Sequence, residues 1–477
     1  MKINFNILVF LVIIVSCSSR EDNTDIIKPQ IYYISPVEGF EGTRIYINGN
    51  NFISDAKYEI LLGEYSIEPI SVTFNQLIFI IPSGISPGCY QIKLKVNDLT
   101  IIASQSITIK AKIIPIDDPE ILSYNYSLGT QSLGPAYNFT SEDRLIETAK
   151  AILDMGSNIL KITLSVTSYN ITGRSYNSLT SLVRDDPSFS EVLNMPFIYY
   201  FFWARSNSNW ADGYSDSERM EDSVQIGDLA VYLLTKYNNS GKRFYIGHWE
   251  GDWYLLPNYD VTYIPTDQRI NGMIQWLRTR QNAVDEAKKI TNHTNVEVFT
   301  YCEVNRVVDA MNGLRRVVNY VLPFTNVDYV SYSSYDSQNY DENRFKDVLN
   351  YIEGNLPPKP EIPGKRVFIG EMGKCAQDFG FNKAQHETVN RENIRKAISW
   401  GAPFVLYWEM YNNEIKDGVH RGFWLIDNTN SKWPLYDTYF HFYNDAKQWV
   451  LNYKKTYGKL PTHEEYLTWA FERLANP

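Results

Sequence analysis

Two acidic residues stand at the ends of apolar runs, where a side chain leaves a buried strand and enters a cleft. The run "FYIGHWEGDWY", residues 244–254, releases Glu250 between two tryptophans, and "RVFIGEMGK", residues 366–374, encloses Glu371 between an apolar run and Gly373. Two carboxyl groups on opposite walls of one cleft can cleave a glycosidic bond. One protonates the leaving oxygen, while the other attacks the anomeric carbon or activates water against it. Glu250 and Glu371 are therefore the candidate catalytic pair.

The other candidate residues are polar or aromatic, and they follow the same kind of run. Flat tryptophan and tyrosine rings can stack on the apolar faces of sugars, while histidine can hydrogen-bond hydroxyl groups. The residues expected to bind substrate or support the acids are His248, Trp249, Trp203, Glu303, Tyr332, Tyr335 and Trp408. Glu303 is an alternative to Glu250 as the proton donor.

These candidates require a scaffold that brings the ends of distant runs together. From residue 119 onward, eight apolar runs alternate with amphipathic helical segments, a pattern that predicts a parallel sheet covered by helices. The expected strands cover residues 120–126, 158–166, 197–204, 243–250, 296–304, 327–335, 366–372 and 404–411. We predict an α/β fold with a (β/α)8 TIM barrel over residues 119–477, whose active site lies at the carboxyl ends of the strands. An open doubly wound sheet competes, but no glycine-rich phosphate turn follows the first expected strand.

The expected fourth, seventh and eighth strands resemble those of clan A glycoside hydrolases. In that clan the acid/base and nucleophile glutamates end strands 4 and 7, which implies these roles for Glu250 and Glu371. The run "FVLYWEMY" resembles the clan's strand 8, whose tryptophan, here Trp408, floors the cleavage subsite. Tyr332 or Tyr335 would fill the role of a hydroxyl that hydrogen-bonds the nucleophile.

One position departs from the pattern of the clan. Most members place an asparagine directly before the strand-4 glutamate, where it binds the sugar 2-hydroxyl, and this chain has Trp249 there. Either His248 supplies that hydrogen bond from a shifted geometry, or Glu303 replaces Glu250 as the acid. The sequence leaves both interpretations open.

Residues 29–112 predict a small all-β domain ahead of the barrel. Their short apolar runs are separated by Gly, Pro, Asn and Ser turns, which is typical of a sandwich. The segment "ISPVEGFEGTRIYINGNNF", followed by "IPSGISPGCYQIKLKV", resembles an IPT/TIG immunoglobulin-like domain. Its turn and anchor positions are Gly42, Gly49, Asn51 and Phe52. Residues 113–118 are the expected linker, because their prolines stop strand pairing and helix alike.

The first residues predict export and lipid attachment. An apolar run from Ile7 to Val15 is too short to span a bilayer and fits the core of a signal peptide. The sequence "IIVSC" resembles a bacterial lipobox, which implies a signal peptide over residues 1–16 and acylation of Cys17. The polar tether over residues 17–28 is similar to that of Bacteroidetes surface lipoproteins. The resemblance implies a surface-exposed location at the cell outer membrane.

Composition narrows the classes of function. A formal net charge of −10 disfavours nucleic acids, whose phosphates reward a basic surface. The six histidines form no HExxH pair, and the chain has no G-x-S-x-G elbow and no P-loop. The cysteines have no metal-binding spacing, so we expect neither a metal nor another cofactor. The main alternative to an enzyme is a non-catalytic surface lipoprotein that binds glycans.

The expected substrate is a neutral β-linked polysaccharide, with β-glucan as the first choice. Several tryptophans spread over the expected loops favour an open cleft with several subsites, and therefore endo action. No cluster of arginine and lysine for uronates is seen at the strand ends. An Ig-like domain and a clan A barrel on a lipid anchor are similar to the endo-β-1,3-glucanases of glycoside hydrolase family 158. This architecture implies other glycan-uptake proteins as further partners.

Replacing the cysteine of the lipobox tests the anchor. Cys17→Ala removes the thiol that would be acylated, so we expect the chain to leave the membrane fraction of fractionated cells. Cys89→Ala is the matched control and should stay with the membranes. A Cys17→Ala chain that remains membrane-bound would show that the lipid anchor is wrong.

Overall fold

The computed structural model describes residues 28–110, 116–206 and 208–475. The chain forms two compact units, one ending at residue 114 and the other beginning at residue 115. The expected signal peptide, Cys17 and nearly all of the tether lie outside the described residues, as does part of the expected linker. Within the described part, none of the helices combines the length and the apolar character needed to cross a bilayer.

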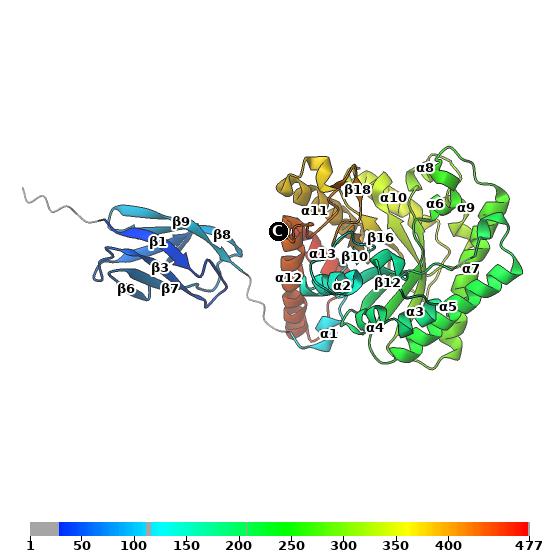
Figure 1. Cartoon of the computed structure of the whole chain (residues 1–477), viewed down its shortest axis with the longest axis horizontal. Helices are drawn as coiled ribbons and strands as arrows, with labels where there is room; N and C mark the ends of the chain where they lie inside the picture. The colour runs from blue at the N-terminus through cyan, green and yellow to red at the C-terminus, as the bar shows by residue number, and fades with distance from the viewer. Residues whose placement is uncertain (1–27, 111–115, 207, 476–477) are drawn as a thin grey trace, which may run out of the picture. The chain divides into compact units, whose positions relative to one another are not determined.

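The first unit is a sandwich of two β-sheets (Figure 1). One sheet has the strand order β1-β3-β7-β6, and the other has the order β2-β9-β8-β4-β5. The strands are β1 (Gln30–Ser35), β2 (Glu38–Gly39), β3 (Arg44–Asn50), β4 (Tyr58–Leu62), β5 (Tyr65–Ile67), β6 (Ser71–Thr73), β7 (Gln76–Ile80), β8 (Gly88–Val96) and β9 (Leu99–Ile109). Alternate residues face inward, as in β4, where Tyr58, Ile60 and Leu62 are buried. The small all-β domain is confirmed.

Gly49 lies where β1 and β3 approach each other closely. A Cβ atom at this position would lie 1.9 Å from the carbonyl oxygen of Gln30, so a larger residue would force the backbones apart. The ring of Phe52 packs against the same spot and is buried. The glycine therefore has a packing reason as well as a place in the turn pattern.

The second unit is built on a closed barrel of eight parallel strands, in the order β10-β11-β12-β13-β14-β15-β16-β17. The strands are β10 (Leu128–Ser132), β11 (Ile159–Thr163), β12 (Tyr199–Trp203), β13 (Arg243–Gly247), β14 (Glu297–Val304), β15 (Tyr329–Ser333), β16 (Val367–Met372) and β17 (Val405–Tyr407). Their order follows the chain and the ends meet between β10 and β17. The expected closed barrel is confirmed, and the open doubly wound sheet is excluded.

The first barrel strand is not the one expected from the sequence. Residues 120–126 were expected to form it, but α1 (Pro119–Leu122) begins this segment. Asp118 caps the helix by accepting a hydrogen bond from the backbone N–H of Glu120, and Pro119 occupies its first turn. The strand is instead β10, whose polar residues are fully buried and therefore give no apolar signal.

Helices surround the barrel in the second unit (Figure 1). They are α2 (Arg144–Asp154), α3 (Leu179–Asp185), α4 (Pro187–Asn194), α5 (Asp216–Lys236), α6 (Gly251–Leu255), α7 (Asp267–Ile290), α8 (Val307–Met311), α9 (Val317–Tyr320), α10 (Glu342–Gly354), α11 (Lys383–Trp400), α12 (Pro434–Tyr457) and α13 (His463–Ala475). Each barrel strand is followed by at least one of them. In α2, Leu145, Ala149 and Ile152 bury one face against the barrel.

Aromatic side chains fill the interior of the barrel. The rings of Phe201 and Tyr245 stack with centroids 4.4 Å apart, and Phe368 and Phe404 pack on Phe201. Much of the chain's aromatic content is therefore core packing. This layer closes the barrel beneath the strand ends, so ligands can reach those ends from one side only.

Candidate active site

A cavity of about 1090 Å³ lies over the carboxyl ends of the barrel strands. The expected site residues in its lining are Trp203, His248, Trp249, Glu250, Tyr335, Glu371 and Trp408. They come from the ends of β12, β13, β16 and β17 and from η5 (Ser334–Asp336) after β15. Glu303 and Tyr332 are fully buried and lie outside the lining.

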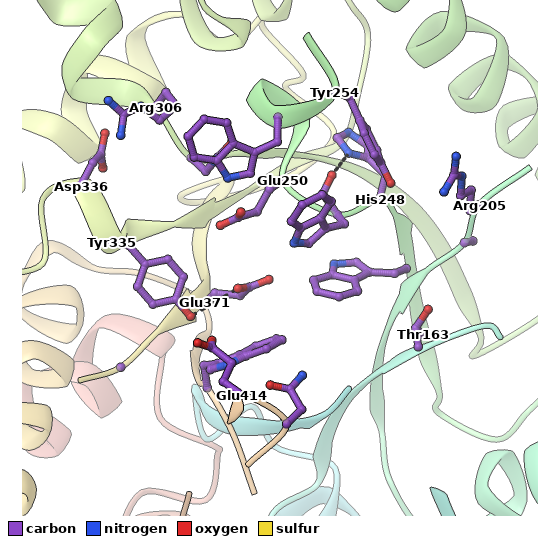
Figure 2. Close-up of a pocket in the computed structure, with 18 of the residues that line it drawn as sticks. Thr163, Arg205, His248, Glu250, Tyr254, Arg306, Tyr335, Asp336, Glu371 and Glu414 are labelled. Atoms are coloured by element: carbon purple, nitrogen blue, oxygen red, sulfur yellow. Dashed lines mark hydrogen bonds between the residues drawn. The ribbon is translucent and has the colours of Figure 1, made fainter. Parts of the chain in front are cut away.

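Glu250 and Glu371 point into the same cavity (Figure 2). Glu250 follows β13 at the start of α6, and Glu371 lies near the end of β16. These two strands are three places apart in the barrel order, so their ends face each other across the mouth. Tyr335 donates a hydrogen bond of 3.3 Å to Oε2 of Glu371. Of the two tyrosines considered for this contact, Tyr335 makes it, whereas Tyr332 bonds Asp336.

Burial raises the pKa of both carboxyl groups. The pKa of Glu250 rises to about 8, because burial and the charge of Glu303 outweigh the charge of Lys161 and a hydrogen bond from Trp253. Burial also raises the pKa of Glu371 well above its ordinary value, and the ammonium group of Lys161 opposes that rise. Glu250 is therefore protonated at neutral pH.

Glu303 lies beneath the cavity rather than in its wall. Its Oε1 accepts the backbone N–H of Glu250 at 3.0 Å, and its Oε2 accepts hydrogen bonds from Ser331 at 2.6 Å and Lys161 at 3.0 Å. The side chain is fully buried. Both of its carboxyl oxygens are thus bound by protein groups, and Glu303 supports the segment that carries Glu250.

Lys161 was not expected from the sequence. It lies in β11, fully buried, and its ammonium group reaches Oε2 of Glu303 at 3.0 Å, the carbonyl of Gly370 at 3.0 Å and Oε1 of Glu371 at 3.4 Å. It also lies 4.6 Å from the ring centroid of Trp203. A lysine in the middle of the apolar run "NILKITLSV" was the available signal, since a buried lysine needs a charged partner.

The acids of the segment 244–254 have different surroundings. Asp252 is buried and accepts hydrogen bonds from the backbone N–H groups of Val317 at 2.8 Å, Asn305 at 3.0 Å and Arg306 at 3.0 Å. It therefore ties the loops after β13 and β14 together. Glu250 makes no such set of backbone contacts, and it faces the cavity.

Both ring nitrogens of His248 face protein atoms. Nδ1 donates to the carbonyl of Trp249 at 2.8 Å, which leaves Nε2 to accept the N–H of Glu303 at 3.4 Å. Burial lowers the pKa of His248 to about 4, so the ring is neutral at neutral pH. His248 thus orients the loop before Glu250, and this leaves neither nitrogen turned toward a sugar hydroxyl.

Tryptophan side chains line the cavity together with the two carboxyl groups. The rings of Trp203 and Trp408 lie 6.1 Å apart between centroids, with a tilt of 32°. Their indole Nε1–H groups are buried and have no acceptor among the described residues. Two unpaired donors in an aromatic wall suit a ligand that offers hydroxyl oxygens. Trp249, half-buried, lines the same cavity.

Several basic residues line the cavity, although the sequence predicted no cluster of them near the site. The lining includes Arg205, Arg269, Arg306, Lys374 and Arg421. Three of these have a carboxylate partner: Arg306 bonds Asp309 at 2.9 Å, Arg421 bonds Glu414 at 2.6 Å, and Lys374 lies 4.0 Å from Asp378. The loops that carry these residues are not adjacent in sequence, which is why spacing did not reveal them.

A group of three or more His, Cys, Asp or Glu side chains arranged to hold a metal ion is not found in the part of the chain that the structure describes. The expectation that no metal or other cofactor is needed stays a prediction.

A sequence model of the IPT/TIG domain matches residues 29–111. Residues 29–111 form an IPT/TIG domain. This confirms the resemblance noted for the segment, and it covers the sandwich that precedes the barrel. No curated protein sequence matches the chain.

Solved structures similar to this chain include three enzymes that act on sugars. A family 39 glycoside hydrolase from Bacteroides cellulosilyticus has a TM-score of 0.44 and 11% identity, covering 88% of this chain and 83% of its own. A GH5 xyloglucanase from Bacteroides ovatus, in complex with a heptasaccharide, has a TM-score of 0.40 and 11% identity, covering 86% and 97%. A β-D-glucuronidase from Dictyoglomus thermophilum has a TM-score of 0.39 and 10% identity, covering 88% and 69%.

Substitutions of Asp252 and of Glu250 should change the free energy of unfolding in opposite directions at high pH. Asp252→Ala leaves two buried N–H groups and a half-buried one without their acceptor, so we expect it to lower the free energy of unfolding by at least about 3 kcal/mol. Glu250 has a folded pKa of about 8 against an ordinary 4.5, so the folded state binds its proton more tightly and the wild type loses stability as pH rises between these values. Glu250→Gln removes this loss, and the variant should be more stable than the wild type above pH 8.

Urea denaturation followed by tryptophan fluorescence at pH 6 and pH 9 measures both effects. A cost below 1 kcal/mol for Asp252→Ala would contradict the structural role of Asp252. If Glu250→Gln destabilised the protein as much at pH 9 as at pH 6, the raised pKa of Glu250 would be contradicted.

Proposed function

We propose that this chain is a retaining glycoside hydrolase, with Glu250 as the acid/base and Glu371 as the nucleophile. The observation that carries this proposal is a pair of buried carboxyl groups that point into one aromatic-walled cavity from facing strand ends. Their surroundings differ, because Tyr335 and the ammonium group of Lys161 contact Glu371, whereas Glu250 has a pKa of about 8 and holds a proton at neutral pH. One neutral acid and one carboxylate are what double displacement at a glycosidic bond requires.

In the first step, the proton of Glu250 passes to the glycosidic oxygen while Oε of Glu371 attacks the anomeric carbon. The C–O bond to the leaving sugar breaks, and an ester between Glu371 and the remaining sugar forms. Glu250, now a carboxylate, takes a proton from water, whose oxygen attacks the same carbon. The ester bond then breaks, and both carboxyl groups return to their starting protonation states.

The substrate we propose is a neutral β-linked polysaccharide, with β-glucan as the first choice and internal bonds as the point of attack. A cavity of about 1090 Å³ exceeds the range of about 300–1,000 Å³ that is typical of small-molecule pockets, so it has room for several sugar units. The carboxylate partners of Arg306, Lys374 and Arg421 reduce the positive charge of the wall, which suits an uncharged glycan. Trp203 and Trp408 add stacking surfaces with unpaired N–H donors.

The position held by asparagine in clan A needs another donor in this chain. Trp249 occupies that place, and His248 has both nitrogens turned toward protein atoms. Asn305 lines the cavity from the end of β14, and its Oδ1 accepts the backbone N–H of Asp252. That hydrogen bond fixes the side-chain amide, so we propose that its Nδ2 group binds a sugar hydroxyl beside Glu250.

We further propose that the enzyme is anchored in the outer membrane through Cys17 and works at the cell surface beside other glycan-uptake proteins. The lipobox pattern before Cys17 and the acidic tether after it support this location. In chain order, the IPT/TIG domain follows Cys17 and precedes the barrel. A (β/α)8 barrel held in this way resembles the family 158 endo-β-1,3-glucanases in architecture.

Release of reducing ends from laminarin, mixed-linkage glucan, mannan and xylan tests the activity. We expect Glu371→Ala to lower hydrolysis of the cleaved glycan by at least about a thousandfold. Glu250→Gln should lower it by at least about a hundredfold, because general acid catalysis is lost. In the wild type, kcat/KM should fall as pH rises through about 8, where Glu250 loses its proton.

Glu387→Ala is the control, because Glu387 is a buried acid of α11 that bonds Arg391 outside the cavity. Near-normal hydrolysis by Glu371→Ala would overturn the assignment. Binding of a glycan without any release of reducing ends would support the non-catalytic glycan-binding lipoprotein instead.

A further inference from the structure

Lys161 connects the two sides of the candidate site from below. Its ammonium group has three hydrogen-bond donors, and three acceptors surround it: Oε2 of Glu303, Oε1 of Glu371 and the carbonyl of Gly370. These acceptors come from β14 and β16, whereas Lys161 belongs to β11. The ring of Trp203 covers the group on a further side at 4.6 Å. The ammonium position is therefore fixed by all of its neighbours.

A continuous chain of contacts runs beneath the cavity from Glu250 to Glu371. The backbone N–H of Glu250 donates to Oε1 of Glu303, and Oε2 of the same carboxyl group accepts from Lys161. Lys161 in turn contacts Oε1 of Glu371 at 3.4 Å. Because each member is at least nine-tenths buried, solvent does not screen this chain. It can hold the two carboxyl groups at a fixed separation and pass charge effects between them.

A second buried lysine shows what is particular to Lys161. Lys242 lies just before β13, and among the described residues its ammonium group donates to neutral acceptors alone: the carbonyls of Met195 and Phe197 and the hydroxyl of Tyr200. Lys161 instead contacts two carboxylates, and both contacts belong to the candidate site. Structural support of the barrel explains the first arrangement but not the choice of carboxylates in the second.

We propose that Lys161 is a positioning residue that keeps Glu371 ionised and fixes its orientation, so that the single proton of the pair resides on Glu250. This inference rests on the proposed function, because it assigns the ionisation order that the nucleophile and the acid need. The ammonium group of Lys161 contacts Glu371 at 3.4 Å and so favours its charged form, whereas it acts on Glu250 as a nearby charge without an ion pair. The position of the Lys161 ammonium group thus favours a negative charge on Glu371 rather than on Glu250.

The ionisable groups that face Lys161 and Glu371 come from several elements of the barrel mouth. They are Glu250, Glu303, Glu409, His248, Tyr301 and Tyr335. Burial keeps His248 neutral and raises the pKa of both tyrosines, so these three do not titrate between pH 5 and pH 9. The charges that act on Glu371 in that pH range are therefore those of the neighbouring glutamates and of Lys161.

The test compares Lys161→Met, Lys161→Arg and the control Lys242→Met in the full chain. Loss of the cation raises the pKa of Glu371, so less of it is ionised at acidic pH. The acidic limb of the kcat/KM profile of Lys161→Met should therefore move upward by about one to three pH units. At pH 6 we expect kcat to fall at least tenfold, with KM changing less than threefold. Lys161→Arg keeps the positive charge, so its acidic limb should lie between those of Lys161→Met and the wild type. Lys242→Met should lose stability but keep the pH profile of kcat/KM unchanged.

A second measurement does not depend on activity. With glutamate labelled with ¹³C at the carboxyl carbon, the Glu371 resonance, assigned by its loss in Glu371→Gln, should titrate at higher pH in Lys161→Met than in the wild type. If neither protein hydrolyses any glycan but this shift is seen, the proposed function fails while the role of Lys161 stands. An unchanged titration, an unchanged acidic limb in Lys161→Met, or an equal shift in Lys242→Met overturns the inference.

Discussion

Four buried glutamates gather around one ammonium group at the mouth of the barrel. Glu303 and Glu371 contact Lys161 directly, and its charge also reaches Glu250 and Glu409. An ionised carboxylate costs several kcal/mol to bury without a partner, so these four groups cannot all carry a charge at neutral pH. The shortage of cations therefore leaves at least one carboxyl group protonated. Burial raises the pKa of both carboxyl groups that face the cavity, and in the proposed mechanism the proton resides on Glu250, where a proton donor is needed.

The barrel brings these carboxyl groups and the single ammonium group together at one end of its strands. Parallel strands end on the same side, so acids from β13 and β16 meet over a floor of packed aromatic rings. The floor excludes water from below, while Asp252 and Glu303 fix the loop that carries Glu250 through backbone hydrogen bonds. The carboxyl groups are thus held by residues that do not face the ligand, and Glu250 and Glu371 remain free to face it.

Sequence patterns predicted the parts that depend on local spacing. Period-two runs and turn residues gave the sandwich, apolar runs between helices gave the closed barrel, and strand ends gave Glu250 and Glu371 as residues of one cavity. Two parts could not be obtained in this way. The strand β10 has buried polar residues and so lacks an apolar pattern, and Lys161 pairs with Glu371 across 210 residues of sequence. Contacts between the side chains of distant strands depend on barrel register, which a single sequence does not show.

The stereochemistry of the first product tests the central claim most directly. ¹H NMR during the earliest phase of hydrolysis of a β-linked glycan separates the two anomers of the new reducing end before mutarotation mixes them. Double displacement through Glu371 predicts that the β-anomer appears first, because two inversions at the anomeric carbon restore its configuration. First appearance of the α-anomer would mean a single displacement by water and would contradict the proposed roles of Glu250 and Glu371.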